Sequence, residues 1–436
     1  MRTLRRWVLR MAAVLAVVYL LLLVDWRGRA TPGPPVVRRA FDVVGPITAG
    51  AARVRLAPPL PVVRAGYGPR KAVADSERDP LEVRAIVLRA SGHAIAIVLA
   101  DIVLIPGELA VALEARVADL RLDGVVLVAT HTHSSVGGYD GRALAQVVAM
   151  GRYRADVVAC LLDRGAQAVR EAAAQSEPVH AWTAEARLRG WAENRSTPGG
   201  AIDDMLSVAA LRTEGGGPLA TLAVAAAHPT LFSRTVPQLS GDYPGEAMRR
   251  LGAGQGPALL LQGAEGDARP PGTGEEAIQR HGALIAQRVT EALATARSAE
   301  DRLGFADVEI GLPPGEPQGI RSFLLRRPAA NVVNWMVPAT TRVTVIRIGD
   351  LVLLGVPGEP TALAGAWMVG ALPPLQVKGL KVRVVGLVQD YVGYVDAPGR
   401  IRARQGESRR MWFAPELLDA VTSGLMVGVS ALGSAS

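Results

Sequence analysis

The chain has 436 residues, of which 49% are hydrophobic, enough for a large core. Its formal net charge is +8, but the arginines are dispersed and no Lys/Arg block alternates with aromatic residues, so a nucleic acid partner is not expected. Cys160 is the only cysteine, which excludes an intramolecular disulfide and a cysteine-based zinc site.

Residues 1–30 are typical of a transmembrane anchor or a signal sequence. Arginines at positions 2, 5, 6 and 10 precede an unbroken apolar run from Met11 to Val24. Such arginines stay in the cytoplasm while the rest of the chain crosses the membrane. No small-residue cleavage site follows cleanly, so we expect a single-pass membrane protein with an extracytoplasmic globular domain; secretion after cleavage is the alternative. Residues 31–46, rich in Pro, Gly and Arg, are expected to be a linker.

Residues 47–436 are expected to form one large domain of the α/β class. The hydrophobic pattern predicts hairpins within 83–103, 205–227 and 342–356, helices at 107–120, 143–174 (with a break near Gly151), 275–296 and 361–372, and further strands at 51–56, 125–129, 258–262 and 381–388. Because hairpins and strand–helix units are mixed, we expect mixed β-sheets covered by helices and not an all-parallel barrel.

Polar residues follow several predicted strands at the point where each strand ends. The first of these strands ends in His131 and His133, and because a strand alternates its side chains, we expect both to point to the same face. Later strands lead into further candidates: His228, Glu265, Asp267, Glu359, Tyr391 and Tyr394. Proteins of the α/β class usually place their chemistry at such carboxyl ends. Two histidines and a carboxylate are a common catalytic zinc shell, whereas solvated polar strand ends are the alternative.

Six short motifs occur in a fixed order along the chain: Thr130–Ser134, Asn194–Ser196, His228–Thr230 with Ser240–Gly245, Gly266–Asp267, Pro357–Glu359 and Asp390–Tyr394. Together they resemble the neutral/alkaline ceramidase family over about Ala49 to Pro415, the catalytic domain of that family. The resemblance implies a zinc-dependent amidase that hydrolyses the N-acyl bond of ceramide or a related lipid amide by metal-activated water.

The resemblance also assigns roles to individual residues. It implies four zinc ligands: His131, His228, Glu359 and Tyr391. It implies groups that act on or contact the substrate: His133 as an acid or base, Arg195, Tyr391, Tyr394 and Asp267. Asp101 and Asp267 would orient the ligands, as metal sites require.

One departure from the family concerns the Gly-Asp-x-Ser-Pro element, which reads Gly266–Pro270 here with Arg269 in place of the serine. Arg269 would either bind an acidic head group or fatty-acid product, or point away and pair with a carboxylate. An active membrane-tethered amidohydrolase and a ceramidase-like envelope protein that binds a ligand without turnover are therefore both open. A two-metal barrel amidohydrolase is disfavoured because regular strand–helix alternation is absent.

Overall fold

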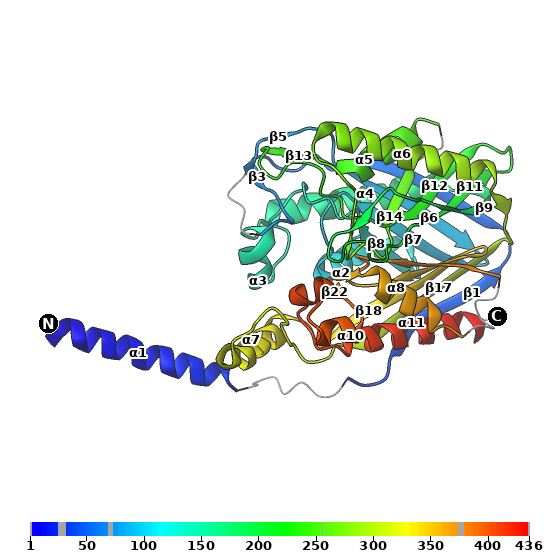
Figure 1. Ribbon diagram of the computed structural model, residues 1–436. Coiled ribbons are helices and arrows are strands. Elements are labelled where there is room, and N and C mark those ends of the chain that lie inside the picture. The colour runs from blue at the N-terminus through cyan, green and yellow to red at the C-terminus, as the bar shows by residue number, and fades with distance from the viewer. Residues whose placement is uncertain (1, 25–31, 69–72, 255, 374–378, 435–436) are drawn as a thin grey trace.

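The computed structural model describes residues 2–24, 32–68, 73–254, 256–373 and 379–434. Two β-sheets face each other across the main core, and helices cover their outer faces (Figure 1). The prediction of mixed sheets covered by helices is confirmed.

The larger sheet has nine strands in the order β14-β12-β11-β9-β2-β6-β7-β8, with β16 beside β9. Its two outer pairs, β7/β8 and β12/β14, are parallel, whereas the inner strands are antiparallel. In chain order the strands are β2 (Ile47–Arg55), β6 (Glu82–Ala90), β7 (His93–Ala100), β8 (Gly124–Ala129), β9 (Glu177–Arg187), β11 (Met205–Thr213), β12 (Pro218–Ala225), β14 (Ala258–Gln262) and β16 (Arg297–Ser298). The β6–β7 and β11–β12 hairpins match the prediction, while β9 was not predicted.

The smaller sheet has five strands in the order β1-β17-β18-β19-β21. They are β1 (Val36–Val44), β17 (Arg302–Gly311), β18 (Thr340–Ile348), β19 (Leu351–Gly355) and β21 (Lys381–Val385). The prediction of a linker at 31–46 is wrong from Val36 onward, because these residues form edge strand β1, paired antiparallel with β17. The strand is held by Phe41, which is buried, and by Asp42, which pairs with Arg302.

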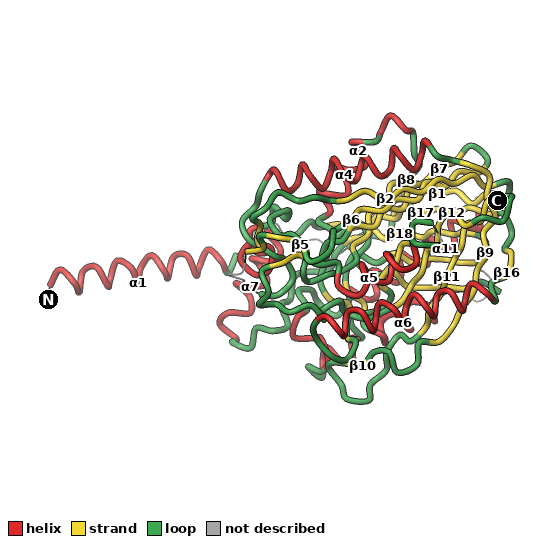
Figure 2. Tube along the Cα trace, turned by 90° about the horizontal axis from the view of Figure 1, so that it is seen from above, coloured by secondary structure: helices red, strands yellow, loops and turns green. Residues whose placement is uncertain are grey.

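The longer helices bury an apolar face, and all of them except α7 pack on the sheets. They are α2 (Gly107–Arg116), α4 (Ala155–Ala174), α5 (Asp242–Gly252), α6 (Glu275–Ala294), α7 (Phe323–Met336), α8 (Ala362–Gly370) and α11 (Leu417–Ser434). Figure 2 shows α4 and α6 on opposite sides of the strands. The break predicted near Gly151 is confirmed, because the short helix α3 (Ala143–Ala145) and the π-helical turn η2 (Gln146–Met150) end there, before α4.

Short elements complete the described chain. They are β3 (Val62–Val63), β4 (Val73–Ala74), β5 (Ser76–Glu77), β10 (Glu193–Asn194), β13 (Gln238–Leu239), β15 (Ala268–Arg269), β20 (Glu359–Pro360), β22 (Tyr394–Val395), η1 (Ala118–Leu120), α10 (Pro398–Arg402) and η3 (Gly406–Arg410). Two of these, β20 and β22, pair with each other in parallel and carry residues of the candidate site.

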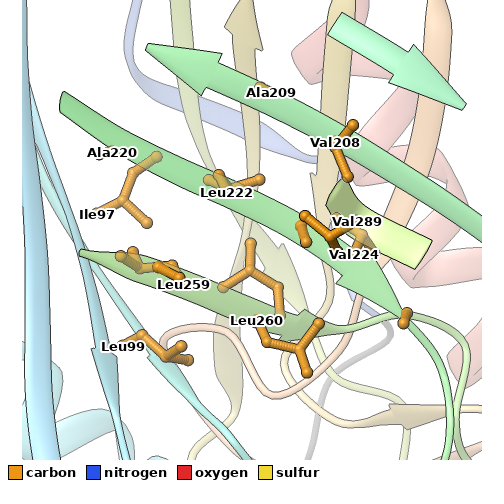
Figure 3. Packing of buried hydrophobic residues seen from close by; sticks show 14 of the residues in the cluster. Ile97, Leu99, Val208, Ala209, Ala220, Leu222, Val224, Leu259, Leu260 and Val289 are labelled. Atoms are coloured by element: carbon orange, nitrogen blue, oxygen red, sulfur yellow. The ribbon is translucent and has the colours of Figure 1, made fainter. Parts of the chain in front are cut away.

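The core is built almost entirely from aliphatic side chains. In Figure 3, Leu222 on β12 and Leu259 on β14 pack near Ile97 on β7, and Val289 of α6 joins them. Removing such side chains from water is the dominant favourable contribution to folding. This packing holds the ends of β8, β12 and β14 in place.

The predicted N-terminal helix is present as α1 (Arg2–Leu22), which projects from the body beside α7 (Figures 1 and 2). Among the described residues, no helix is long and apolar enough to cross a membrane. After Arg10 the helix offers only Met11 to Leu22, about 18 Å at 1.5 Å per residue, against a hydrocarbon core of about 30 Å. The membrane-spanning segment predicted within 1–30 is therefore not supported. Residues 25–30 of that segment lie outside the described part of the chain. The extracytoplasmic location of the globular domain stays a prediction.

Candidate functional site

The candidate site lies where the carboxyl ends of strands from both sheets meet. His131 follows β8 and His228 follows β12 in the larger sheet, while Glu359 follows β19 in the smaller sheet. The two sheets are joined at this point by a bridge between Val128 and Val388. The predicted convergence of strand ends thus brings residues far apart in sequence into one place.

His131 is held by two backbone carbonyls in the segment that follows the neighbouring strand β7. Its N–H donates to the Ile102 carbonyl at 3.0 Å, and its ring Nδ1 lies 2.6 Å from the Val103 carbonyl oxygen. Because a carbonyl only accepts, Nδ1 carries the proton and Nε2 presents a lone pair. Strand β8 ends at Ala129, and His131 has a left-handed backbone with φ of 66°. The alternation of side chains along a strand therefore does not place His131 and His133 on one face.

His228 is held in the same tautomer. Its Nδ1 lies 2.8 Å from the Glu265 carbonyl oxygen and 3.2 Å from that of Ala268, so this nitrogen carries the proton and Nε2 is free to accept. Burial, aided by the positive charge of Arg195, lowers the pKa of His228 to about 4. The ring is therefore neutral at pH 7.

Glu359 faces both imidazoles with one carboxylate oxygen. Its Oε2 lies 3.0 Å from His228 Nε2 and 3.5 Å from His131 Nε2. Two imidazole lone pairs and a carboxylate oxygen repel one another unless a cation lies among them. Nitrogen and carboxylate donors in this number fit zinc.

Tyr391 supports the same carboxylate from the other side. Its hydroxyl donates to Glu359 Oε1 at 2.6 Å. Burial and the negative charge of Glu359 raise the pKa of Tyr391 well above its usual value, so the phenol keeps its proton without a metal. The four residues predicted to hold zinc are thus brought together.

His133 completes a cluster of three buried rings. Its Nε2 lies 3.3 Å from His131 Nε2, and the ligand nitrogens of His131, His133 and His228 all lie within 4.8 Å of one another. Its Nδ1 has no hydrogen-bond partner among the described residues. Burial and the other two imidazoles hold the pKa of His133 well below its ordinary value, so the ring is neutral and able to accept a proton.

Arg195 reaches the cavity from the loop after β10. Its Nη2 donates to the Tyr394 hydroxyl at 2.7 Å and to the Gly266 carbonyl at 3.0 Å, while Nε donates to Glu407 at 2.9 Å. Burial would lower the pKa of Arg195, but Tyr394 and Glu407 raise it above its ordinary value. The guanidinium is therefore charged and oriented. Glu407, in η3, was not predicted, because only this distant contact reveals it.

Asp267 and Asp101 are buried supports behind the site. Asp267 accepts from Asn194 Nδ2 at 2.8 Å and from the Ala362 N–H at 2.9 Å, which holds the loop that carries Arg195. Asp101 accepts from the Glu82 N–H at 2.9 Å and from Arg84. Neither carboxylate lines the cavity, so Asp267 positions other residues and does not itself face a substrate.

Arg269 is not brought into the site. Its side chain is 55% exposed and its Nη2 lies 2.8 Å from Glu193 Oε1. The two residues are cross-strand partners in the short β10–β15 ladder, which directs Arg269 away from the cavity. The substrate contact predicted for Arg269 is therefore not supported, and the alternative, pairing with a carboxylate, is what the structure shows.

A cavity of about 570 Å³ opens above the buried cluster. His131, His133, Glu359 and Tyr391 line its polar end. Its remaining walls are largely apolar and include Leu144, Val148, Met150, Val333, Met336, Val337, Trp412 and Phe413. An apolar cavity ending in a few convergent polar groups is the usual form of a ligand site.

No family model matches the chain, and no curated protein matches it by sequence. Among solved structures it is similar to neutral ceramidase from Pseudomonas aeruginosa, with a TM-score of 0.77 and 19% identity over 89% of this chain and 75% of that one. A ceramidase complexed with C2 gives a TM-score of 0.78 with the same identity and coverage. The chain therefore has the neutral ceramidase fold, which confirms the resemblance of its motifs at the level of the fold.

Proposed function

We propose that the protein is a zinc-dependent amidohydrolase that cleaves the N-acyl bond of a ceramide-like lipid amide. The observation that carries the proposal is the convergence of two imidazole lone pairs and the Glu359 carboxylate at the end of an apolar cavity. The ligands would be His131, His228, Glu359 and Tyr391. The fold shared with neutral ceramidases supports the substrate class.

When bound, zinc polarises a carbonyl group and lowers the pKa of water to about 7. The chain supplies the remaining functions. The apolar walls bind an acyl chain and exclude water, and the donors of Arg195 and Tyr394 would hold the amide oxygen. As the water oxygen adds to the carbonyl carbon, His133 takes its proton. His133 then passes that proton to the nitrogen as the C–N bond breaks, releasing a fatty acid and an amine.

The test is the release of fatty acid from N-acyl sphingosine by the purified full chain. We expect turnover that disappears after chelation, returns with added zinc, and falls by about 100-fold or more in His133→Ala, which removes the acid–base group. A zinc-loaded chain that binds the lipid without hydrolysing it would overturn the proposal in favour of a non-catalytic binding protein.

A further inference from the structure

Glu265 is a fully buried carboxylate for which the metal shell described above has no role. It lies in the loop after β14 and is 0% exposed. Both of its side-chain oxygens lack a hydrogen-bond partner among the described residues. Buried carboxylates are normally paired with a cation or bound to a metal, because leaving the charge unpaired in the interior is strongly unfavourable.

The position of Glu265 directs its side chain toward the candidate metal centre. Its backbone is held on both sides, since its N–H donates to the Gly263 carbonyl at 3.0 Å and its carbonyl accepts from His228 Nδ1 at 2.8 Å. One ligand atom each from Glu265, His131 and Glu359 lie within 4.8 Å of one another. Two carboxylates and an imidazole therefore converge beside the three-imidazole cluster.

The surroundings leave room for this carboxylate but provide no protein cation for it. A Cβ at Gly386 would lie 2.9 Å from Glu265 Oε2, so the absence of a side chain there admits the carboxylate. Arg195 is the positive group nearby, but its bonds go to Glu407, the Gly266 carbonyl and Tyr394. Among the described residues, no salt bridge reaches Glu265.

We propose that Glu265 is an additional ligand of the metal centre and gives it a second carboxylate beside Glu359. The inference rests on the proposed function, because it assumes that this centre binds a divalent cation. Zinc binds tetrahedral N and O ligands at about 2.0–2.2 Å, which places neighbouring ligand atoms about 3.3–3.6 Å apart. Atoms that lie within 4.8 Å of one another therefore need to approach by at most about 1.5 Å when the ion binds. Two carboxylates balance the charge of a divalent cation, which the single carboxylate of the predicted shell does not.

The experiment compares metal binding by the full wild-type chain, Glu265→Gln and a control, Glu114→Gln. Glu114 pairs with Arg39 and does not line the cavity. Zinc affinity is measured by competition with a chromophoric chelator, and the visible spectrum is recorded with Co²⁺ in place of zinc. We expect E265Q to bind zinc at least tenfold more weakly and to shift the Co²⁺ bands, while E114Q matches the wild type.

Unchanged zinc affinity and an unchanged Co²⁺ spectrum in E265Q would overturn the inference and leave the proposed function intact. A wild-type chain that binds no metal would overturn both. If E265Q fails to fold, Glu265→Asp is the second variant, because it keeps the charge but shortens the reach by one methylene. Weakened metal binding in the folded Glu265→Asp chain supports the inference, and wild-type affinity contradicts it.

Discussion

At the residue scale, the tautomers of two histidines decide what the site can bind. The Val103 and Glu265 carbonyls accept from Nδ1 of His131 and His228, so both Nε2 atoms face Glu359 without a proton of their own. This is the arrangement found when histidines bind a metal, since a partner on the distal nitrogen sets the ring orientation and the tautomer.

Arg195 offers a prediction at the same scale. Its three hydrogen bonds orient the planar guanidinium toward the cavity. The single ammonium group of a lysine cannot reproduce this geometry. We expect Arg195→Lys to lower kcat/KM for a lipid amide by about 100-fold, as for the loss of one oriented donor, with zinc content unchanged. Arg269→Lys is the matched control and should behave as the wild type. Equal losses in both variants would show that the orientation of Arg195 is not what matters.

Individual site residues were predictable to the extent that they stand in short motifs. His131, His228 and Glu359 each follow a strand and were named from the sequence. Glu407 was not, because its role depends on a contact with Arg195 across 212 positions. Glu265 also follows a strand, but the sequence does not mark it as a metal ligand. Its candidacy depends on its burial without a hydrogen-bond partner among the described residues, which only the structure reveals.

At the scale of elements, the site depends on a join between the two sheets. The Gln389 side chain accepts from the Leu127 N–H at 3.0 Å and donates to the Val125 carbonyl at 2.9 Å, and its own N–H donates to the Leu127 carbonyl at 2.9 Å. This connects β8, which leads to His131, with the loop that leads to Tyr391. The smaller sheet is thereby held against the larger one beside the metal ligands.

Gln389→Ala should therefore destabilise the protein. The substitution leaves two buried backbone groups of β8 without partners, at about 1–3 kcal/mol for each. We expect the free energy of unfolding in urea to fall by about 2–5 kcal/mol. Gln167→Ala, which removes a part-buried glutamine on α4 that bonds only to neighbouring helix side chains, should change it by less than about 0.5 kcal/mol. Similar effects in the two variants would contradict the role of Gln389.

Asp242, the first residue of α5, gives a prediction for pH. Burial raises its pKa from 3.8 to about 6. A raised carboxyl pKa means that the folded state holds the proton more tightly, so this contribution to stability is present below pH 3.8 and is lost as pH rises through 6. We expect wild-type stability relative to Asp242→Asn to fall by about 2.4 kcal/mol between pH 4 and 7.

Urea unfolding of wild type and Asp242→Asn across this pH range provides the measurement. The variant also loses one acceptor for the Phe232 or Tyr243 N–H, but that cost does not change with pH and leaves the trend intact. A difference between the two chains that stays constant with pH would show that folding does not raise the pKa of Asp242.

The hydrophobic pattern predicted several strands and helices correctly, but strands β1, β9 and β17 and helices α5, α7 and α11 were not predicted. The hairpin of β6 and β7 reads as two apolar strands around a turn. Strand β1 contains Arg38 and Arg39, which pair with Glu309 and Asp307 on β17, so its polar residues suggested a linker. Its partners lie more than 250 positions away, and a local pattern cannot reveal them.

At the scale of the whole molecule, the fold places the chemistry at one edge of a two-sheet core. Parallel pairs in both sheets, β12/β14 and β19/β21, send their carboxyl ends to the same region. The sequence predicted mixed sheets covered by helices and the strand ends that carry polar residues. It could not predict which strands share a sheet, because that depends on long-range pairing. For the same reason it could not predict which residues line the apolar cavity.

The measurement that tests the central claim most directly is the metal content of the purified full chain. After dialysis against a fixed free zinc concentration, the wild type should hold stoichiometric zinc and the His131→Ala, His228→Ala double variant should hold almost none, because both free imidazole nitrogens are gone. Circular dichroism checks that the variant is folded. Stoichiometric zinc in the folded double variant would contradict the account.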